Sequence, residues 1–183
     1  TGHVDPDRMG LIGHSWGGYQ ASYLPTRMHR FAASVAGAAI TNFLSFSGAV
    51  HWNGGLPELG HWETGQARMA VPMWEDFEGH LESSPTHFIQ DLETPVLLMH
   101  GDEDGTVDFR QSLEYYNYAR RAGKEVVMLV YPGADHGLRE EKQQVDYHRR
   151  ILEWFDHHLK GEKAAGWIKD GESWVERGKR IGN

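Results

Sequence analysis

The sequence predicts an α/β fold in which helices cover both faces of a parallel sheet. Short apolar runs bounded by glycine or proline recur along the chain, as expected for strands buried on both faces. Segments of helical composition separate these runs, and this alternation is typical of a parallel sheet with right-handed crossovers. With 183 residues, of which 39% are hydrophobic and 24% charged, the chain is long enough for one compact domain.

The first predicted element is a strand at residues 8–13, an apolar run that ends in glycine. A tight turn follows, and residues 17–30 have helical composition with Pro25 near their end. This segment therefore has the order strand, tight turn, helix.

Three further buried strands are predicted at residues 31–37, 94–101 and 125–133. Between the last two, residues 109–123 have helical composition and end in Gly123, a natural C-terminal cap. This segment can form the crossover helix.

A long helix is predicted from about residue 140 to residue 160, stopping before Gly161. Steps of three and four residues give it an apolar stripe made of Val145, His148, Leu152, Phe155 and Leu159. We expect the helix to pack on the sheet through this stripe.

Two segments break the alternation of strands and helices. Residues 42–90 are rich in Gly, Trp, His and Pro without a long period, which indicates an excursion beside the functional site. Residues 161–183 alternate Lys, Glu and Gly with aromatic residues such as Trp167 and Trp174, which favours a surface extension. We therefore expect one domain over residues 1–160, followed by that extension.

The composition argues against several classes of partner and site. The formal net charge of −8 opposes binding to nucleic acid, and the lack of cysteine excludes disulfides, thiolate metal sites and a cysteine nucleophile. The weakly polar stretch at residues 31–40 is shorter than the roughly 20 apolar residues that span a bilayer. Residues 1–10 contain no initiator methionine and no secretion signal. We therefore expect a cut inside a longer protein, and the compartment is undecided, with a lean to a periplasmic or secreted location.

The strongest motif is G-x-S-x-G at residues 13–17, directly after a predicted strand and before a predicted helix. A serine on so sharp a turn is strained, and we expect glycine to be required at both Gly13 and Gly17. Ser15 is then the predicted nucleophile, and the backbone N–H of Trp16 is a predicted donor to an oxyanion at the helix N-terminus. The alternative is a glycine-rich turn with an incidental serine.

A serine nucleophile needs a histidine base, which a carboxylate orients. The predicted base is His136, because it lies in the loop directly after the last predicted strand. Four rivals are less suitable. His148 falls on an apolar stripe, His157 and His158 end a helix, and His14 can hardly turn back to the serine.

The predicted acid is Asp104, in the loop after the strand at residues 94–101. It lies in an H-G-x-x-D-x-x-V arrangement from His100 to Val107. Asp102 and Asp108 are read as solvated carboxylates or caps, although Asp102 stays open as the alternative acid. The chain order of serine, aspartate and histidine is the order of α/β-hydrolases.

The same acidic loop does not fit a calcium site. Placing Gly105 at the invariant glycine of an EF-hand loop puts His100 at the first ligand position and Gln111 at the bidentate position. The sequence also has no H-E-x-x-H helix and no cysteine-based zinc spacing, so we expect no metal and no cofactor.

Three segments, at residues 4–19, 94–109 and 131–138, together resemble the catalytic domain of prolyl oligopeptidase-family serine peptidases. Residues 40–55 and 62–69 resemble a bacterial branch of dipeptidyl aminopeptidases and acylaminoacyl peptidases. The resemblance implies hydrolysis of oligopeptides through an acyl-enzyme. Two alternatives stay open: a carboxylesterase with the same triad, and a hydrolase-like module that binds without turnover.

The resemblance also implies parts beyond this sequence. Family members have an N-terminal β-propeller and an eight-stranded hydrolase domain whose nucleophile follows the fifth strand. The chain is therefore expected to be the C-terminal half of an α/β-hydrolase fold, whose partners are a peptide substrate, the other half and a propeller. The second oxyanion-hole donor has no counterpart here. The resemblance implies that the S1 substrate pocket is lined by Phe43, Leu44, Phe46, Trp52 and Val107. The alternative is that these side chains are part of the core.

Overall fold

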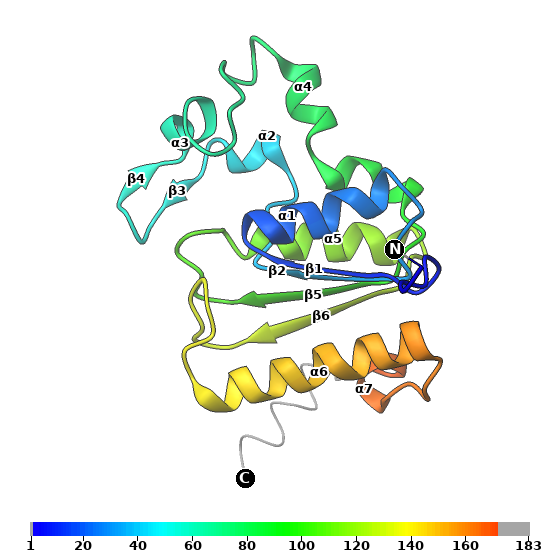
Figure 1. Ribbon diagram of the computed structural model, residues 1–183. Helices are drawn as coiled ribbons and strands as arrows, with labels where there is room; N and C mark the ends of the chain where they lie inside the picture. Colours follow the sequence, from blue (N-terminus) through cyan, green and yellow to red (C-terminus); the bar gives the residue numbers. More distant parts are fainter. Residues whose placement is uncertain (1, 172–183) are drawn as a thin grey trace.

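A parallel sheet forms the centre of the molecule (Figure 1). The computed structural model describes residues 2–171. The sheet has the order β1-β2-β5-β6, and its strands are β1 (Gly10–His14), β2 (Ala33–Gly37), β5 (Val96–Gly101) and β6 (Val126–Tyr131). All neighbouring strands are parallel, so the predicted α/β class and its four strands are confirmed.

Helices cover both faces of this sheet (Figure 1). One face packs against α1 (Trp16–Tyr23) and α5 (Arg110–Arg121), and the other against α6 (Glu141–Lys160) and α7 (Gly166–Lys169). Successive side chains of a strand point to opposite faces. In β5, Leu98 therefore joins the core under α1 and α5, whereas Leu97 joins the core under α6.

The first helix is shorter than the sequence predicts. It ends at Tyr23, and a single 3-10 turn, η1 (Leu24–Thr26), follows. Pro25 ends the α-helix because its nitrogen has no hydrogen to donate and its ring clashes with the carbonyl four residues earlier.

The long helix α6 has almost the predicted bounds, and Gly161 ends it in a left-handed conformation with φ 71°. The predicted stripe is wrong for its first three residues, since Val145 is 62% and Leu152 is 64% exposed, and His148 is exposed too. The face that packs on the sheet is formed by Tyr147, Ile151, Trp154, Phe155 and Leu159. The fully buried Trp154 sets the rotation of the helix.

His158 lies near the end of α6 with its side chain only 9% exposed. Its ring stands edge-on to Trp154 at 4.2 Å, and its Nε2 has no hydrogen-bond partner among residues 2–171. Burial, with a smaller contribution from the neighbouring His157, lowers the pKa of His158 from 6.5 to about 4. The nearest carboxylate is Glu125, whose Oε1 is 3.7 Å from Nε2.

This lowered pKa predicts a loss of stability in acid. Between about pH 6.5 and pH 4 the unfolded chain binds a proton at His158 that the folded chain does not bind. The free energy of unfolding should therefore fall across that range, by up to roughly 3 kcal/mol. Urea unfolding of the complete protein at several pH values tests this. His158→Leu should flatten the pH dependence, whereas the exposed control His148→Ala should leave it unchanged; an unchanged slope in His158→Leu contradicts the assignment.

The segment after α6 packs against the core through one aromatic residue. Trp167 in α7 is buried and stacks on Trp154, with ring centroids 6.3 Å apart. The chain from residue 161 to 171 thus follows the surface of α6 and contributes to the core under it. The rest of the predicted extension, residues 172–183, lies outside the described residues.

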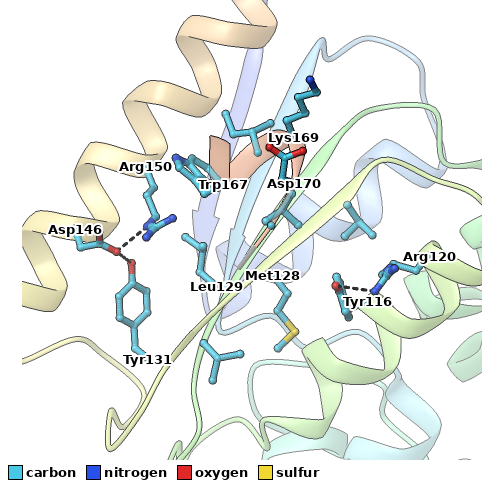
Figure 2. A pocket seen from close by; sticks show the side chains of 15 residues that line it. Tyr116, Arg120, Met128, Leu129, Tyr131, Asp146, Arg150, Trp167, Lys169 and Asp170 are labelled. Carbon is cyan, nitrogen blue, oxygen red and sulfur yellow. Dashed lines mark hydrogen bonds and ion pairs between the residues drawn. The ribbon is translucent and has the colours of Figure 1, made fainter. Parts of the chain in front are cut away.

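A hollow of about 790 Å³ lies along β6, which forms one edge of the sheet. Figure 2 shows its polar side, where Asp146 accepts hydrogen bonds from Tyr131 and Arg150. The lining comes from β6 and from helices α5, α6 and α7 and the residues just after α7, and it includes none of Ser15, Asp104 and His136. The hollow is therefore separate from the predicted site.

Within residues 2–171, no helix combines the length and the apolarity needed to cross a membrane.

The excursion at residues 42–90 is a series of short elements. They are α2 (Phe43–Phe46), the hairpin strands β3 (Val50–His51) and β4 (Leu56–Pro57), α3 (Leu59–Glu63), α4 (Phe77–Glu82) and the 3-10 segment η2 (Pro85–Asp91). Their common core contains Ile40, Phe43, Phe46, Trp62 and Val107. The hairpin and α3 project on the side of the carboxyl ends of the strands (Figure 1).

Candidate active site

The turn from β1 to α1 holds Ser15 in a strained backbone conformation, with φ 59° and ψ −118°. The N–H of Ser15 donates to the carbonyl of Gly37 at the end of β2, which ties the turn to the sheet. A Cβ atom at Gly13 would lie 2.1 Å from the carbonyl oxygen of Gly17. The first glycine of the motif is therefore required by the closeness of strand and helix.

The expectation that glycine is also required at Gly17 is wrong, as far as the described residues 2–171 show. A Cβ there meets no atom within 4 Å, whereas a Cβ at Gly18 would lie 2.2 Å from the carbonyl oxygen of Gly37. The reason is that α1 packs tightly across the end of β2. The point of closest approach is at Gly18, one residue later than the motif suggests.

This difference predicts opposite outcomes for two neighbouring substitutions. Gly18→Ala should lower the free energy of unfolding by about 1–3 kcal/mol, because the added methyl forces α1 away from β2. Gly17→Ala should be neutral or slightly stabilising, since alanine is the better helix former. Thermal or urea unfolding of both variants compares them directly, and equal destabilisation would show that the close approach at Gly18 is misplaced.

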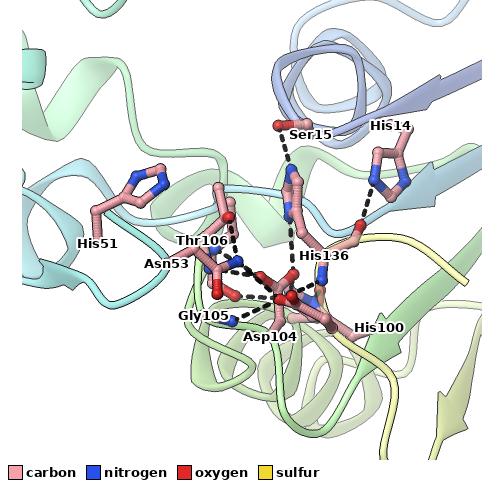
Figure 3. A network of polar contacts seen from close by, with 12 residues as sticks. His14, Ser15, His51, Asn53, His100, Asp104, Gly105, Thr106 and His136 are labelled. Atoms are coloured by element: carbon pink, nitrogen blue, oxygen red, sulfur yellow. Dashed lines mark hydrogen bonds and ion pairs between the residues drawn. The ribbon is translucent and has the colours of Figure 1, made fainter. Parts of the chain in front are cut away.

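Ser15, His136 and Asp104 lie in one chain of hydrogen bonds (Figure 3). Ser15 Oγ is 2.8 Å from His136 Nε2, and His136 Nδ1 is 2.9 Å from Asp104 Oδ2. An ionised carboxylate only accepts, so Nδ1 carries the proton and Nε2 is free to accept from the serine. The three residues follow β1, β6 and β5 respectively, so all three lie at the carboxyl ends of parallel strands.

The environment of Asp104 keeps its carboxylate ionised. Its side chain has no exposed surface. Burial by itself raises the pKa of Asp104, but hydrogen bonds from His100, His136 and the backbone N–H of Val107 outweigh burial and hold the pKa well below its ordinary value. Oδ1 also accepts from the N–H of Thr106 at 2.8 Å.

The other two carboxylates of this loop point elsewhere. Asp102 Oδ1 accepts from the N–H of Gly133 at 2.7 Å, and Asp108 Oδ1 accepts from the N–H of Arg110 at 2.8 Å. The structure therefore brings Asp104, and neither Asp102 nor Asp108, to the imidazole of His136.

His14 has a role that the sequence analysis did not assign. Its Nε2 lies 2.6 Å from the carbonyl oxygen of His136, which can only accept, so His14 donates this bond. Burial, followed by the charge of His136, lowers the pKa of His14 and keeps it neutral. The residue before the nucleophile therefore anchors the loop of the base, and no local pattern signals this contact because the two residues are 122 positions apart in sequence.

Asp135 makes a second set of contacts that the sequence analysis did not predict, and these contacts join three loops. Asp135 Oδ1 accepts from the N–H of His136 at 2.7 Å, from the N–H of Gly105 at 3.1 Å and from Asn53 Nδ2 at 2.9 Å. Asn53 also donates to Thr106 Oγ1 at 2.9 Å. The turn of the β3–β4 hairpin is thus fixed to the loops of the acid and the base (Figure 3).

Trp16 directly follows Ser15 and begins α1, where helix N–H groups have no acceptor within the helix. Its indole Nε1 donates to Gln66 Oε1 at 3.0 Å, and its ring packs on Trp62 with centroids 6.1 Å apart. These contacts fix the side chain of Trp16, and its backbone N–H stays the predicted oxyanion donor.

The five residues predicted to line a substrate pocket do not all lie together. Phe43, Phe46 and Val107 are buried in the core of the excursion, and Leu44 is half-buried. Trp52 is 73% exposed at the hairpin turn. Phe43 stands edge-on to Trp16, with ring centroids 6.2 Å apart. Their contact with substrate stays a prediction.

Comparison with known proteins identifies the family of the chain from its sequence. The sequence model of the prolyl oligopeptidase family matches residues 1–162. The chain belongs to the prolyl oligopeptidase family. The resemblance deduced from the sequence is therefore confirmed, as is the α/β-hydrolase fold.

Two relatives illustrate the range of this family. The chain is 30% identical over 160 residues to the uncharacterised peptidase YuxL of Bacillus subtilis, covering 86% of this chain and 23% of YuxL. It is 31% identical over 160 residues to the acylamino-acid-releasing enzyme of Rattus norvegicus, covering 86% and 21% respectively. The chain thus spans less than a quarter of the length of these two relatives.

Solved structures show the same fold. The acylaminoacyl peptidase of Pyrococcus horikoshii superposes with a TM-score of 0.76 at 20% identity, covering 93% of this chain and 27% of that one. A puromycin-hydrolysing peptidase of Mycobacterium tuberculosis superposes with a TM-score of 0.75 at 25% identity, covering 86% and 23%. Both solved chains are several times longer than the part that matches.

Proposed function

We propose that the chain supplies the catalytic residues of a serine peptidase that cleaves oligopeptides through an acyl-enzyme. The observation that carries this proposal is the continuous chain of hydrogen bonds from Ser15 through His136 to the buried Asp104. Family membership supports peptide hydrolysis, and the short distances support activation of a serine hydroxyl.

The first half of the proposed reaction forms the acyl-enzyme. Ser15 Oγ attacks the carbonyl carbon of the scissile bond while His136 Nε2 accepts the hydroxyl proton. The resulting imidazolium lies against the ionised Asp104, and the oxyanion receives the backbone N–H of Trp16. His136 then gives its proton to the leaving amine as the carbon–nitrogen bond breaks.

The second half releases the acid product. Water enters where the amine left, His136 takes its proton, and the hydroxide attacks the acyl carbon. Collapse of this second tetrahedral intermediate breaks the bond to Ser15 Oγ, which regains the proton from His136. Asp104 keeps its charge throughout because its pKa lies well below the ordinary value.

We also propose that this chain forms part of a larger hydrolase sheet. β1 is an edge strand, and its Ile12 is 55% exposed. Unpaired N–H and C=O groups on a strand edge favour pairing with a further strand. Relatives several times longer than this chain are consistent with such strands, and with the second oxyanion donor and a β-propeller, lying elsewhere in the complete protein.

The test of the proposed function compares an amide with an ester. The complete protein is assayed with an N-acylated peptide anilide and with a short-chain p-nitrophenyl ester, and the two values of kcat/KM are compared. We expect both activities to depend on Ser15, with efficient cleavage of the anilide. Hydrolysis of the ester alone would instead assign a carboxylesterase, and no Ser15-dependent turnover of either substrate would favour a binding module.

A further inference from the structure

A cluster of two histidines and one glutamate lies in the excursion beside the active site. His51 comes from β3, His61 from α3, and Glu58 directly precedes α3. Their ligand atoms all lie within 4.8 Å of one another. Glu58 Oε1 is 2.9 Å from His51 Nδ1, and Glu58 Oε2 is 3.0 Å from His61 Nδ1.

The carboxylate of Glu58 is the unusual member of this cluster. Its side chain is only 1% exposed, and it forms no capping hydrogen bond with α3. A buried carboxylate is costly unless positive charge or strong donors compensate it. Each of its oxygens faces one imidazole, so the compensation must come from the two histidines or from a cation between them.

A chain of hydrogen bonds fixes the protonation of His61. Trp16 Nε1 only donates, so the atom of Gln66 that faces it at 3.0 Å is the acceptor oxygen. The same oxygen lies 2.7 Å from His61 Nε2, which must therefore carry a proton.

A neutral His61 then presents the bare lone pair of Nδ1 to a carboxylate oxygen 3.0 Å away. Two acceptors at this distance repel each other. Either a proton shared between Glu58 and His61 or a metal ion must therefore lie between these two atoms.

We propose that His51, Glu58 and His61 bind one divalent transition-metal ion of the Zn²⁺ type. Two imidazole nitrogens and one carboxylate oxygen form a donor set that zinc sites use, with water at the remaining position. Tetrahedral bonds of about 2.1 Å place donors roughly 3.4 Å apart, so the two nitrogen–oxygen pairs, now 2.9 and 3.0 Å apart, would each widen by about 0.5 Å on binding.

Two further features of the site suit a metal ion. The bond from His61 Nε2–H to Gln66 is the outer contact that orients a metal-bound imidazole and leaves the other nitrogen free to coordinate. The side chains of His51 and His61 are 30% and 34% exposed, so an ion can enter from solvent. The expectation of no metal rested on sequence motifs, and a hairpin strand paired with a helix matches none of them.

The ion would hold the hairpin against α3 next to the nucleophile turn. His61 stands edge-on to Trp16 with ring centroids 6.2 Å apart, and Gln66 bonds to both side chains. Metal binding therefore supports the position of Trp16, the residue after Ser15. The site is a positioning site, and it depends on this geometry alone and not on the proposed peptidase activity.

Metal binding is measured directly on the complete protein after treatment with a chelator. Isothermal titration with ZnCl₂ should show one Zn²⁺ ion bound per chain. The affinity for Zn²⁺ should be at least a hundredfold weaker in His51→Ala/His61→Ala. Titration with Co²⁺ should give the intense visible absorption of a tetrahedral nitrogen and oxygen site. Ser15→Ala should bind the ion as well as the unchanged protein, which separates this test from the test of catalysis.

Matched glycine variants test the geometry without removing a ligand. A Cβ at Gly65 would lie 2.8 Å from His61 Cδ2 and 2.7 Å from its carbonyl oxygen, whereas a Cβ at Gly60 meets nothing within 4 Å. Gly65→Ala should therefore weaken Zn²⁺ binding at least tenfold, and Gly60→Ala should not.

His148→Ala controls for loss of a surface histidine, and far-ultraviolet circular dichroism of the metal-free variants checks that each is folded. Stoichiometric binding that survives the double histidine variant would overturn the proposal. Absence of stoichiometric binding in the unchanged protein would overturn it too, and would leave a proton shared between Glu58 and His61 as the explanation of their contact.

Discussion

Replacing Ser15 with alanine should reduce kcat by about six orders of magnitude, the loss typical of removing a serine nucleophile from a triad. The reason is geometric, since no other hydroxyl is placed 2.8 Å from the Nε2 of His136 in the part of the chain that the structure describes. Steady-state kinetics with the peptide anilide measure the loss in the complete protein.

The control for this variant is another serine of the same region. Ser45 is exposed in α2 and accepts a hydrogen bond from Gln111. Ser45→Ala should keep kcat within a few-fold of the unchanged protein. If Ser15→Ala retained more than about a thousandth of the activity, a different nucleophile would have to be sought.

Replacing Asp104 with asparagine should lower kcat by about ten thousandfold, because the amide no longer fixes the proton of His136 on Nδ1. Asparagine is nearly the same size, so the loss reports charge and tautomer. Asp102→Asn is the matched control, since its Oδ1 can still accept from Gly133. A larger loss in the Asp102 variant would mean that the carboxylates are wrongly assigned.

The low pKa of Asp104 adds a pH dependence to this comparison. A group with a depressed pKa contributes stability above its ordinary value, 3.8 for this aspartate, and the contribution is lost as pH falls through the lower folded value. The carboxylate therefore stays charged where ordinary histidines titrate, near pH 6.5. A fall of kcat/KM between pH 7 and pH 5 should therefore not come from protonation of Asp104.

The sequence was sufficient for features that depend on local patterns. The four strands, the crossover helix and the nucleophile turn are each encoded within a few neighbouring residues, and the structure contains them with small shifts of their bounds. The choice of His136 followed from its place after β6, and the choice of Asp104 from the H-G-x-x-D-x-x-V arrangement in the loop after β5. Parallel strands bring such loops to one edge of the sheet.

Features that depend on contacts between distant segments could not be predicted in this way. The rotation of α6 is set by the fit of Trp154 against the sheet. Two neighbouring rows of side chains on this helix have the same apolar spacing, so the spacing alone does not select the row that is buried. The requirement for glycine at Gly18 arises from the carbonyl of Gly37, which belongs to another strand. The contact of His14 with the His136 loop also joins residues far apart in sequence.

The identity of the reactive residue is tested most directly by covalent labelling. The complete protein is treated with a fluorophosphonate, and the modified residue is identified by peptide mass spectrometry. We expect one adduct per chain, located on Ser15, with no adduct in Ser15→Ala and much slower labelling in His136→Ala. An adduct on another residue, or equal labelling of the Ser15→Ala variant, would contradict the assignment of Ser15 as the nucleophile.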